Sequence, residues 1–381
     1  MASVSTTLAI LGMFFISPVL IPALQHYSFQ ILSFQQGKIL EKLGICSDLT
    51  ILRAAVNGIP PWRDSKLLIK DLTVDEVPLR IYQPKSPPTG KRRGILYFHG
   101  GAGTFGSISK KWTTFHSTSS LSVLYRLAPE HPYPGQYFDC LNATLYFMKN
   151  LKEYHVDPGL IIISGDSCGA NFATVICQIL LNDRDLPKVR AQVLLYPGLQ
   201  GLDFHLPAYQ QNAFVPMLSR KMIIYFCFRY LNKKPTFWKE ILQNSHVPDS
   251  MRHQYKKWVS ADLIPDEFKV RGYVPTKPAP YKPEVHEAIK EILAITFSPL
   301  LAEDSIICQL PESFIVTCEF DVLRDDGLLY KRRLEENGVR VTWYHCENGF
   351  HGILAFFGYG IFSFISGNKI MDNMVNYINS L

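Results

Sequence analysis

Charged side chains are scarce in this sequence, and no long tract of one sign occurs. They account for 19% of the 381 residues, whereas about 25% is usual for soluble domains, and hydrophobic residues account for 47%. These proportions exclude an intrinsically disordered chain, a collagen-like repeat and a coiled coil, and they are compatible with some contact with a membrane. The net charge of +6 is spread thinly, and no basic tract is longer than Lys91–Arg93. We therefore expect no binding to nucleic acid.

Cysteine is also sparse, and its spacing lacks the patterns of a metal or redox site. Eight cysteines in a chain of this length are too few for a scaffold built on disulfides, and no C-x-x-C pair occurs. The sequence thus offers no support for a zinc or thioredoxin-type site, and we expect no metal and no cofactor. Most thiols are expected to be small buried hydrophobic groups, although one or two disulfides can form if the protein lies in an oxidising compartment.

No charged residue precedes Lys38, and the stretch Leu8–Leu24 is almost wholly apolar. A membrane-spanning helix needs about 17 to 20 apolar residues, so this stretch predicts an anchor over residues 1–25, although Pro18 and Pro22 would kink it. A cleaved signal peptide is less favoured, because no Lys or Arg precedes the apolar run and no A-x-A site follows it. A buried or interfacial helix is the alternative.

The charges near this segment bear on its orientation. Lys38 and Lys42 follow it and nothing basic precedes it, which by the positive-inside tendency would place the rest of the chain in the cytosol. That tendency is weakest when a large folded domain follows. The sequon Asn142–Thr144 could be glycosylated only in a lumenal protein, and its expected place within a helix argues against its use.

From about Asp71 the sequence alternates between strand-like and helix-like segments, which predicts an α/β fold: a mostly parallel central sheet with helices on both faces. Residues 203–297 break this rhythm and are aromatic, proline-punctuated and mainly helical, so we interpret them as a helical cap inserted over the strand ends. Strands are expected at 72–74, 77–82, 94–98, 121–125, 160–164, 191–196, 313–318 and 341–344, and helices at 136–154 and 171–181. The expected domains are an anchor (1–25), an N-terminal cap segment (26–70), the first catalytic part (71–202), the cap (203–297) and the second catalytic part (298–381).

The sequence Gly165-Asp166-Ser167-Cys168-Gly169 follows the clearest core strand and opens a helix. G-x-S-x-G alone is a weak signal, but between a strand and a helix it is typical of a nucleophile elbow. The two glycines are needed because side chains in so tight a turn would collide with neighbouring strands. The turn would lift the Ser167 hydroxyl above the sheet at the positive end of a helix. An ordinary glycine-rich strand–helix turn is the structural alternative.

The sequence His99-Gly100-Gly101-Ala102 follows the strand expected at 94–98. Acyl transfer creates a tetrahedral oxyanion that needs backbone N–H donors, and removing one such donor costs about 10²–10³ in rate. Successive glycines permit the close approach of the backbone. We predict an oxyanion hole formed by the amides of Gly100, Gly101 and Cys168, with a simple β-turn as the alternative.

A catalytic acid and base would follow the serine in the order acid, then histidine. Asp321 directly follows the strand at 313–318, at the sheet edge where parallel sheets place their chemistry. His351 lies on a glycine-flanked loop after the last strand. Asp321 would hold the tautomer of His351, which would take the Ser167 proton. Asp325 and Asp326 are rival acids, although both are expected inside the next helix.

Taken together, these segments resemble the hormone-sensitive-lipase branch of α/β-hydrolases, and most closely its arylacetamide deacetylase-like group. The stretches that carry the resemblance are His99–Ala102, Tyr125–Glu130, Gly165–Asn171, Asp321–Gly327 and Gly349–Gly352. The resemblance spans nearly the whole chain, including the anchor. It implies a serine esterase or amide deacetylase for lipophilic acyl compounds, held in the endoplasmic reticulum membrane by a single span with a lumenal catalytic body. On topology we follow the resemblance rather than the charge argument.

This sequence departs from the family pattern in three places. Ala102 replaces the third glycine of the oxyanion motif, and Cys168 stands where alanine is more common. Both residues are small, so the backbone donors should remain. The segment between Ala102 and Tyr125 is shorter than in relatives, so that Ser109–Ser120 must supply both helix and turns from poor helix formers. We therefore hypothesise a weakened fold or reduced activity, which an unfolding midpoint equal to that of a full-length relative would contradict.

Two more apolar stretches, Met222–Leu231 in the predicted cap and Ile353–Ile365 after the histidine, have two interpretations. We favour helix core, and the alternative is a surface that contacts lipid or substrate. The sequence as a whole predicts a membrane-anchored serine hydrolase that forms an acyl-enzyme on Ser167, with a small lipophilic ester or amide and membrane lipid as partners and no obligate protein partner evident. The alternatives are a catalytically weak or silent family member and a lipase that acts at a lipid surface.

Overall fold

The computed structural model describes residues 40–41, 43–57, 65–86, 90, 92–107, 118–215, 217–358 and 363–381. The apolar stretch Leu8–Leu24 and the anchor predicted over residues 1–25 lie outside these ranges. Along the described parts of the chain, every helix is too short or too polar to span a bilayer. The anchor therefore stays a prediction.

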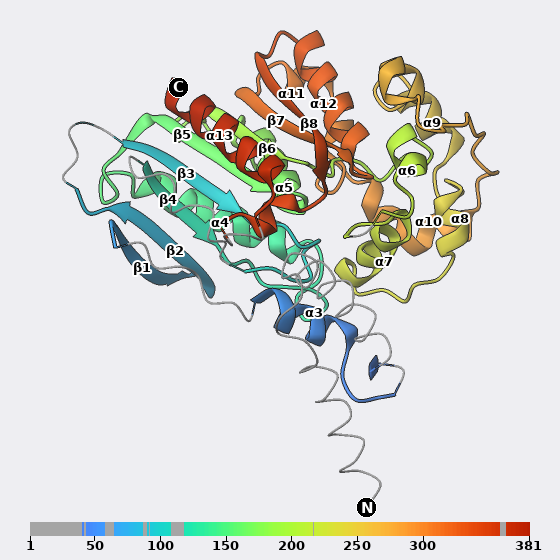
Figure 1. Ribbon diagram of the computed structural model, residues 1–381, viewed down its shortest axis with the longest axis horizontal. Coiled ribbons are helices and arrows are strands. Elements are labelled where there is room, and N and C mark those ends of the chain that lie inside the picture. The colour runs from blue at the N-terminus through green and yellow to red at the C-terminus, as the bar shows by residue number, and fades with distance from the viewer. Residues whose placement is uncertain are drawn as a thin grey trace, which may run out of the picture.

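An eight-stranded sheet forms the centre of the molecule, with the strand order β1-β2-β4-β3-β5-β6-β7-β8 (Figure 1). β1 and β2 form an antiparallel hairpin, β2 also pairs antiparallel with β4, and every further pair is parallel. The mostly parallel sheet predicted from the sequence is thus confirmed. The strands are β1 (Leu67–Val74), β2 (Val77–Pro84), β3 (Arg92–Phe98), β4 (Thr118–Val123), β5 (Val156–Asp166), β6 (Ala191–Leu195), β7 (Glu312–Phe320) and β8 (Val341–Phe350).

Helices cover both faces of this sheet, because successive strand residues point to opposite sides. In β3, Leu96 and Phe98 belong to one buried cluster with the apolar faces of α4, α5 and α12. Their neighbours Ile95 and Tyr97 belong to a second cluster, which α13 covers. The helices outside the cap are α3 (Asp48–Asn57), α4 (Gly135–Lys149), α5 (Cys168–Leu180), α11 (Asp304–Ile307), α12 (Arg324–Glu336) and α13 (Ile365–Ser380).

The stretch predicted as the cap is helical, and its described residues contain no strand. It packs at one end of the sheet (Figure 1). The apolar run Met222–Leu231 forms most of α7, and its buried residues belong to the same cluster as the sheet, which fits the favoured interpretation as helix core. The cap helices are α6 (Pro207–Gln211), α7 (Arg220–Tyr230), α8 (Trp238–Leu242), α9 (Asp249–Tyr255) and α10 (Pro283–Ile289).

The segment before β4 differs from its prediction. The sequence predicts Thr118, Ser119 and Ser120 in the crossover, but they are buried and begin the strand. Their small hydroxyl side chains can be buried there because they find acceptors, as in the Ser119 hydroxyl, which donates to the Tyr154 carbonyl at 2.8 Å. Residues 108–117 lie outside the described ranges, so the hypothesis of a weakened crossover stays a prediction.

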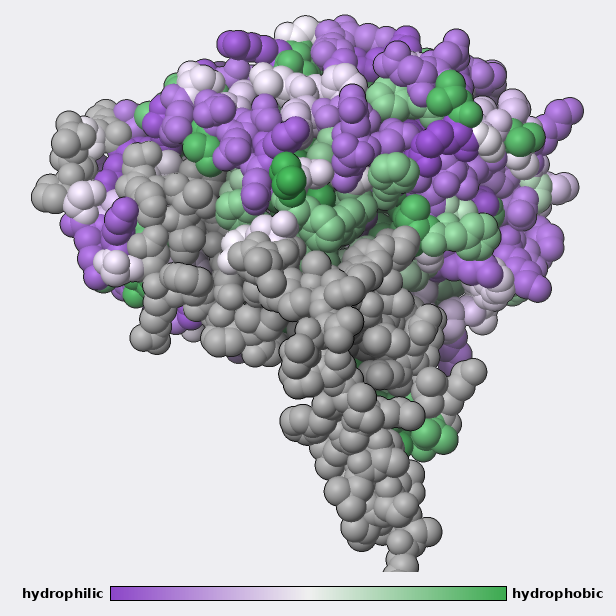
Figure 2. All heavy atoms as spheres, viewed as in Figure 1, coloured by the Kyte–Doolittle hydropathy of each residue, from purple (hydrophilic) through white to green (hydrophobic). Residues whose placement is uncertain are grey.

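The surface is unevenly polar. On the face shown in Figure 2, hydrophilic side chains cover most of the upper part, and hydrophobic ones gather toward its middle. Several large apolar side chains are exposed near the start of the described chain and in the cap, among them Leu43 at 65% and Phe214 at 89%. Exposed apolar groups of this size are compatible with contact between this protein and a nonpolar partner.

Candidate active site

Ser167 lies at the sharp turn between β5 and α5, with φ of 57° and ψ of −123°. Its amide donates to the Leu195 carbonyl of the next strand at 2.9 Å. A Cβ atom on Gly165 would lie 2.3 Å from the Gly169 backbone, and one on Gly169 would lie 2.1 Å from the Phe98 carbonyl oxygen. Only glycine fits at either position, and the strained serine conformation follows from this close approach.

Ser167, His351 and Asp321, which the sequence predicts as a catalytic set, are brought together in one hydrogen-bonded chain. The Ser167 hydroxyl lies 2.8 Å from Nε2 of His351. The Nδ1 atom of that imidazole lies 2.9 Å from Oδ2 of Asp321. The Asp321 carboxylate is fully buried and the His351 side chain is 10% exposed, so solvent competes little for these hydrogen bonds.

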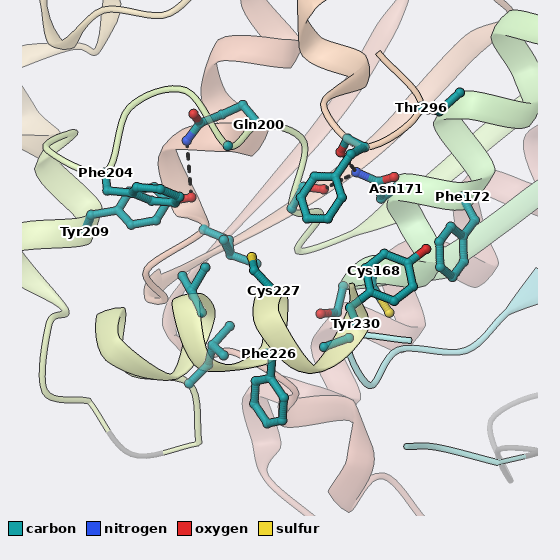
Figure 3. A pocket seen from close by; sticks show the side chains of 18 residues that line it. Cys168, Asn171, Phe172, Gln200, Phe204, Tyr209, Phe226, Cys227, Tyr230 and Thr296 are labelled. Carbon is teal, nitrogen blue, oxygen red and sulfur yellow. Dashed lines mark hydrogen bonds between the residues drawn. The ribbon is translucent and has the colours of Figure 1, made fainter. Parts of the chain in front are cut away.

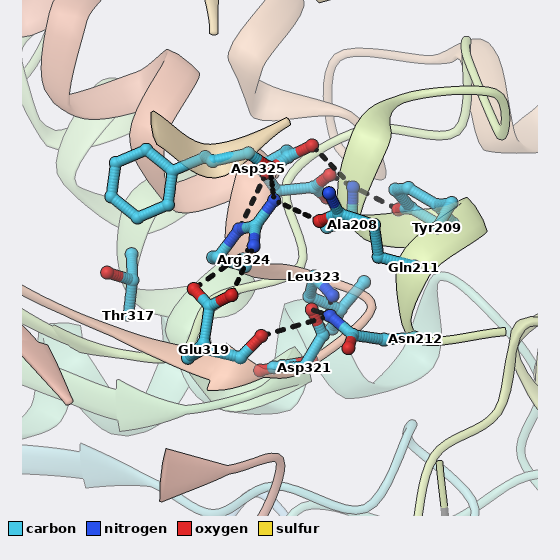
Figure 4. A network of polar contacts seen from close by, with 12 residues as sticks. Ala208, Tyr209, Gln211, Asn212, Thr317, Glu319, Asp321, Leu323, Arg324 and Asp325 are labelled. Atoms are coloured by element: carbon cyan, nitrogen blue, oxygen red, sulfur yellow. Dashed lines mark hydrogen bonds and ion pairs between the residues drawn. The ribbon is translucent and has the colours of Figure 1, made fainter. Parts of the chain in front are cut away.

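Asp321 follows β7 on a loop that both its own backbone and the cap hold in place (Figure 4). Its Oδ1 atom accepts the Leu323 amide at 2.8 Å, which leaves Oδ2 to face the imidazole. Asn212, which ends the cap helix α6, donates its side-chain amide to the backbone carbonyl of Asp321 at 2.9 Å and to that of Glu319 at 3.1 Å. The cap thus fixes the loop that carries the acid.

The rival acids Asp325 and Asp326 lie in the first turn of α12, as the sequence predicts, and both are engaged elsewhere. Asp325 accepts the Ala208 amide at 2.7 Å and pairs with Arg324 at 3.0 Å. Asp326 accepts the Leu199 amide at 2.8 Å, and burial raises its pKa to about 7. These carboxylates hold the cap and a neighbouring loop, whereas Asp321 is the carboxylate that contacts His351.

The amide of Gly100 does not have the role that the sequence suggests. Its N–H donates to Oδ1 of Asp166 at 3.0 Å, and the Tyr97 hydroxyl donates to the same oxygen. The Tyr196 hydroxyl reaches the other carboxylate oxygen at 3.5 Å. Because a buried carboxylate already takes this N–H, the prediction that Gly100 is an oxyanion donor is wrong. Gly100 instead ties the start of the glycine loop to the end of β5.

The next amides in the loop are better placed to act as donors. Gly101 and Ala102 have φ of 119° and 51°, and Ala102 lines the same pocket as Ser167. Within the described ranges, the amides of Gly101 and Cys168 reach no acceptor, and the latter belongs to the first turn of a helix, where N–H groups have no intrahelical partner. The Ala102 amide faces the Cys168 thiol, a weak acceptor. Burial raises the pKa of that thiol to about 12, although the amides of Ala102 and Gly103 oppose the shift.

An apolar pocket opens above Ser167, with a volume of about 780 Å³ that includes the open space at its mouth. Helix α7 forms one wall with Phe226, Cys227 and Tyr230, and Phe204 and Tyr209 lie at the end away from Cys168 (Figure 3). Most of its polar side chains are already occupied; for example, the Asn171 side chain donates to two backbone carbonyls, at 2.7 and 2.8 Å. The pocket therefore suits an apolar group that ends in a carbonyl at Ser167.

The cysteines form no disulfide. Along the described ranges, no group of three or more His, Cys, Asp or Glu side chains could hold a metal ion.

Sequence reasoning missed Asp166, Asn212 and Tyr125. The Tyr125 hydroxyl donates to the His99 carbonyl at 2.6 Å. Asp166 and Tyr125 lie inside motifs that the sequence shows, but no pattern in the sequence indicates their partners, and Asn212 lies in no motif.

Comparison with known proteins places this chain in a hydrolase family. A family model described as "alpha/beta hydrolase fold" matches residues 95–249 and 285–355. The human protein named arylacetamide deacetylase-like 4 is 42% identical over 351 residues, which cover 91% of this chain and 86% of that protein. The Bos taurus protein named arylacetamide deacetylase is 39% identical over 316 residues, which cover 80% of this chain and 79% of that protein.

Solved structures of esterases share the fold. A bacterial heroin esterase superposes with a TM-score of 0.63 at 21% identity and covers 87% of this chain and 91% of its own. An esterase from the fungus Rhizomucor miehei gives a TM-score of 0.63 at 24% identity and covers 87% of this chain and 90% of its own. At these identities the similarity establishes the architecture, and substrates must be argued from the site.

The charged cluster beneath the acid loop makes a testable contribution to stability. Glu319 pairs with Arg271 at 2.7 Å. It also pairs with the fully buried Arg324 at 3.1 Å (Figure 4). Burial raises the pKa of Glu319, but hydrogen bonding to His345 and the two guanidinium charges outweigh it and lower the pKa from 4.5 to about 2. The stabilisation that this ionised group provides is therefore complete above about pH 4.5 and is lost as the pH falls through 2.

We expect Glu319→Gln to lower the free energy of unfolding at pH 7 by about 1–3 kcal/mol, because hydrogen bonds to charged groups have that strength. The deficit relative to the wild-type protein should shrink as the pH falls from about 5 toward 2. Urea unfolding followed by circular dichroism at a series of pH values measures both effects. Glu336→Gln, at a surface pair with Arg332 in which Glu336 is 53% exposed, is the control and should change little. A pH-independent deficit for Glu319→Gln would contradict this account.

Proposed function

This chain belongs to the arylacetamide deacetylase-like group of the α/β-hydrolase family, and from that premise we propose that it is a serine hydrolase that cleaves lipophilic carboxylic esters or acetamides. The observation that carries the proposal is the continuous chain of hydrogen bonds from Ser167 through His351 to Asp321, at 2.8 and 2.9 Å, at the mouth of an apolar pocket. A nucleophile, a base within hydrogen-bonding distance and a group that orients the base are the three parts that covalent acyl transfer needs.

In the first half of the reaction, Ser167 Oγ attacks the carbonyl carbon of the substrate. Nε2 of His351 takes the hydroxyl proton, and Asp321 stabilises the imidazolium and keeps Nδ1 protonated. The carbonyl oxygen becomes an oxyanion that accepts hydrogen bonds from the amides of Gly101, Ala102 and Cys168. When the tetrahedral intermediate collapses, His351 gives its proton to the departing alcohol or amine, and the acyl group remains on Ser167.

In the second half, water takes the place of the leaving group. Nε2 of His351 takes a proton from the water while its oxygen attacks the acyl carbon, and the same loop amides stabilise the second oxyanion. Collapse returns the proton to Ser167 and releases the carboxylic acid. Each proton that leaves a reacting oxygen thus passes through one imidazole, so the reaction calls for no metal or cofactor.

The pocket supports substrates with an apolar acyl or aryl group. Its walls are aromatic and aliphatic, with Phe172, Phe226, Phe297 and Leu323 among them. Burial of apolar surface contributes about 25 cal/mol per Å², so these walls favour a hydrophobic group over a charged one. The names of the relatives in turn support acetyl groups on aromatic amines as candidates. A second candidate, a lipase acting at a lipid surface, is supported by the exposed apolar residues Leu43 and Phe214.

The reactive serine can be tested with a fluorophosphonate probe on the purified full chain. We expect covalent labelling at Ser167, saturable hydrolysis of p-nitrophenyl butyrate, and loss of both in Ser167→Ala, with a drop in kcat of at least about 10³. Asp321→Asn should also lower kcat, because Asp321 contacts His351. Asp325→Asn is its matched control and should leave kcat much closer to the wild-type value, because this carboxylate is equally buried but does not contact His351. No adduct on folded wild-type protein would support the alternative of a silent family member and end the proposal of an enzyme.

Ester chain length separates the two enzyme candidates. An esterase or deacetylase should turn over short soluble p-nitrophenyl esters below their solubility limit, without a rise in rate when droplets form. A lipase should instead show a steep rise in rate on emulsified long-chain triacylglycerol. Mass-spectrometric identification of the serine adduct assigns either activity to Ser167.

Membrane attachment through residues 1–25, with the catalytic body in the lumen of the endoplasmic reticulum, is a further part of the proposal. The apolar stretch Leu8–Leu24 supports it, because its length approaches the roughly 20 residues that a span requires. The chain expressed in cells should stay with membranes in alkaline carbonate, and the body should resist protease added to intact microsomes. A version that lacks residues 1–25 should be released. Digestion of the body without detergent would place it in the cytosol, as the flanking lysines suggest.

A further inference from the structure

Helix α3, near the start of the described chain, is bonded both to the cap and to the glycine loop (residues 99–106). On the cap side, Asp48 is fully buried, pairs with Arg229 of α7 at 3.0 Å and accepts the Tyr225 hydroxyl. On the loop side, Arg53 donates from Nε to the Thr104 carbonyl at 2.8 Å. No motif in the sequence indicates this helix, yet it connects two parts of the candidate site.

The Arg53 guanidinium joins two separate backbone segments. One Nη2 hydrogen bond goes to the Ala128 carbonyl at 2.6 Å, and the same group forms a two-point pair with Glu130 at 2.7 and 2.8 Å. The Ala128 amide in turn donates to the Gly103 carbonyl at 2.8 Å. Arg53, Thr104, Gly103 and Ala128 therefore form a closed ring of covalent and hydrogen bonds around the outer side of the glycine loop.

Thr104 connects the Arg53 hydrogen bond to the loop amides that we propose as oxyanion donors. Its amide and its hydroxyl both donate to the Gly101 carbonyl, at 2.9 and 3.1 Å. The Gly101 carbonyl and the Ala102 N–H belong to one planar trans peptide, so they point in opposite directions. Holding the carbonyl toward Thr104 consequently turns the Ala102 N–H toward Cys168, at the side where Ser167 lies.

The cap also packs against the glycine loop. A Cβ atom on Gly103 would lie 2.5 Å from the Tyr230 ring of α7, so this ring packs directly on the loop backbone. The loop backbone is thus in contact with Tyr230 at Gly103 and is hydrogen-bonded to Arg53 at Thr104. The loop has little freedom as long as both contacts persist.

From these contacts we infer that Arg53 is a positioning residue, which acts through Thr104 to hold the Gly101–Ala102 peptide in the orientation that stabilises the oxyanion. This role rests on the proposed function. Arg53 is not among the residues that line the pocket, and the oxyanion forms only as the reaction proceeds, so we expect its removal to affect the transition state more than substrate binding. The pair with Glu130 contributes little by itself, because Glu130 is 57% exposed. The hydrogen bonds to the two carbonyls carry the role.

The test compares four variants of the full chain, each shown to be folded by its thermal unfolding transition. Arg53→Met removes every donor and keeps an unbranched stem that is as long as the arginine side chain up to Nε. With p-nitrophenyl butyrate, we expect its kcat to fall about 10- to 100-fold with KM within about twofold, which is less than the loss of an entire oxyanion donor. Arg53→Lys keeps the positive charge and N–H donors on a single ammonium group but lacks the guanidinium fork, so it should recover part of kcat. Glu130→Gln keeps both carbonyl bonds and should stay near the wild-type rate.

Arg80→Met is the matched control, because Arg80 also forms a two-point ion pair, with Asp71, and its side chain is 19% exposed against 24% for Arg53. It lies in the β1–β2 hairpin, away from the glycine loop. Its removal should leave kcat unchanged even if it lowers the unfolding temperature.

A second readout separates positioning from a purely structural role. Butylboronic acid forms a tetrahedral adduct on an active serine and resembles the oxyanion intermediate, so its affinity should fall in Arg53→Met by the same factor as kcat/KM. An unchanged kcat and boronate affinity in Arg53→Met would overturn the role of Arg53, as would a rise in KM alone. Lack of turnover and of boronate binding in the wild-type protein would overturn the proposed function, and the role of Arg53 with it.

Discussion

The close approach of backbone at the turn after β5 is the constraint on which the rest of the site depends. Gly169 lies so near the Phe98 carbonyl that no residue with a side chain fits at this position, and Ser167 is held at a positive φ as a result. The first turn of α5 therefore lies directly against the end of β3. Because β3 and β5 are parallel neighbours, their ends bring the glycine loop and the serine together at one edge of the sheet.

The rest of the site consists of loops that the sheet alone would not hold. Asp321 and His351 follow the last two strands, and a cap residue, Asn212, is bonded to the acid loop. The glycine loop is likewise held by its surroundings, with Asp166 bonded to the Gly100 amide and Tyr230 packed against Gly103. In both loops, the groups that would contact the reacting atoms are oriented by hydrogen bonds and packing contacts that neighbouring backbone makes with other parts of the fold. Such support keeps donors in place before the substrate arrives, which is the basis of electrostatic preorganisation.

Much of this arrangement could be predicted because its signals are local. The apolar runs at 160–164 and 313–318 predict two core strands, and the structure extends both by between one and four residues at each end. Strand ends are harder to predict, since Thr118–Ser120 have little apolar character, and the Ser119 hydroxyl is buried in β4 because it finds an acceptor 35 residues away in the sequence. Which of Asp321, Asp325 and Asp326 contacts His351 could also be decided only from the structure. All three lie within six residues, and only the orientation of the loop decides which carboxylate meets the imidazole.

The sequence by itself determined most of the alternation of strands and helices, the family, and the serine and histidine, because each depends on residues that are adjacent in the chain. Only the tertiary structure decided which glycine-loop amides remain available. Gly100 and Asp166 are 66 residues apart in sequence, and Arg53 and Thr104 are 51 apart. No local sequence pattern indicates such pairs. Each donor meets its acceptor only after the sheet, the cap and α3 have packed together. A motif can thus indicate the atoms that react, whereas packing determines which neighbouring groups are free to assist them.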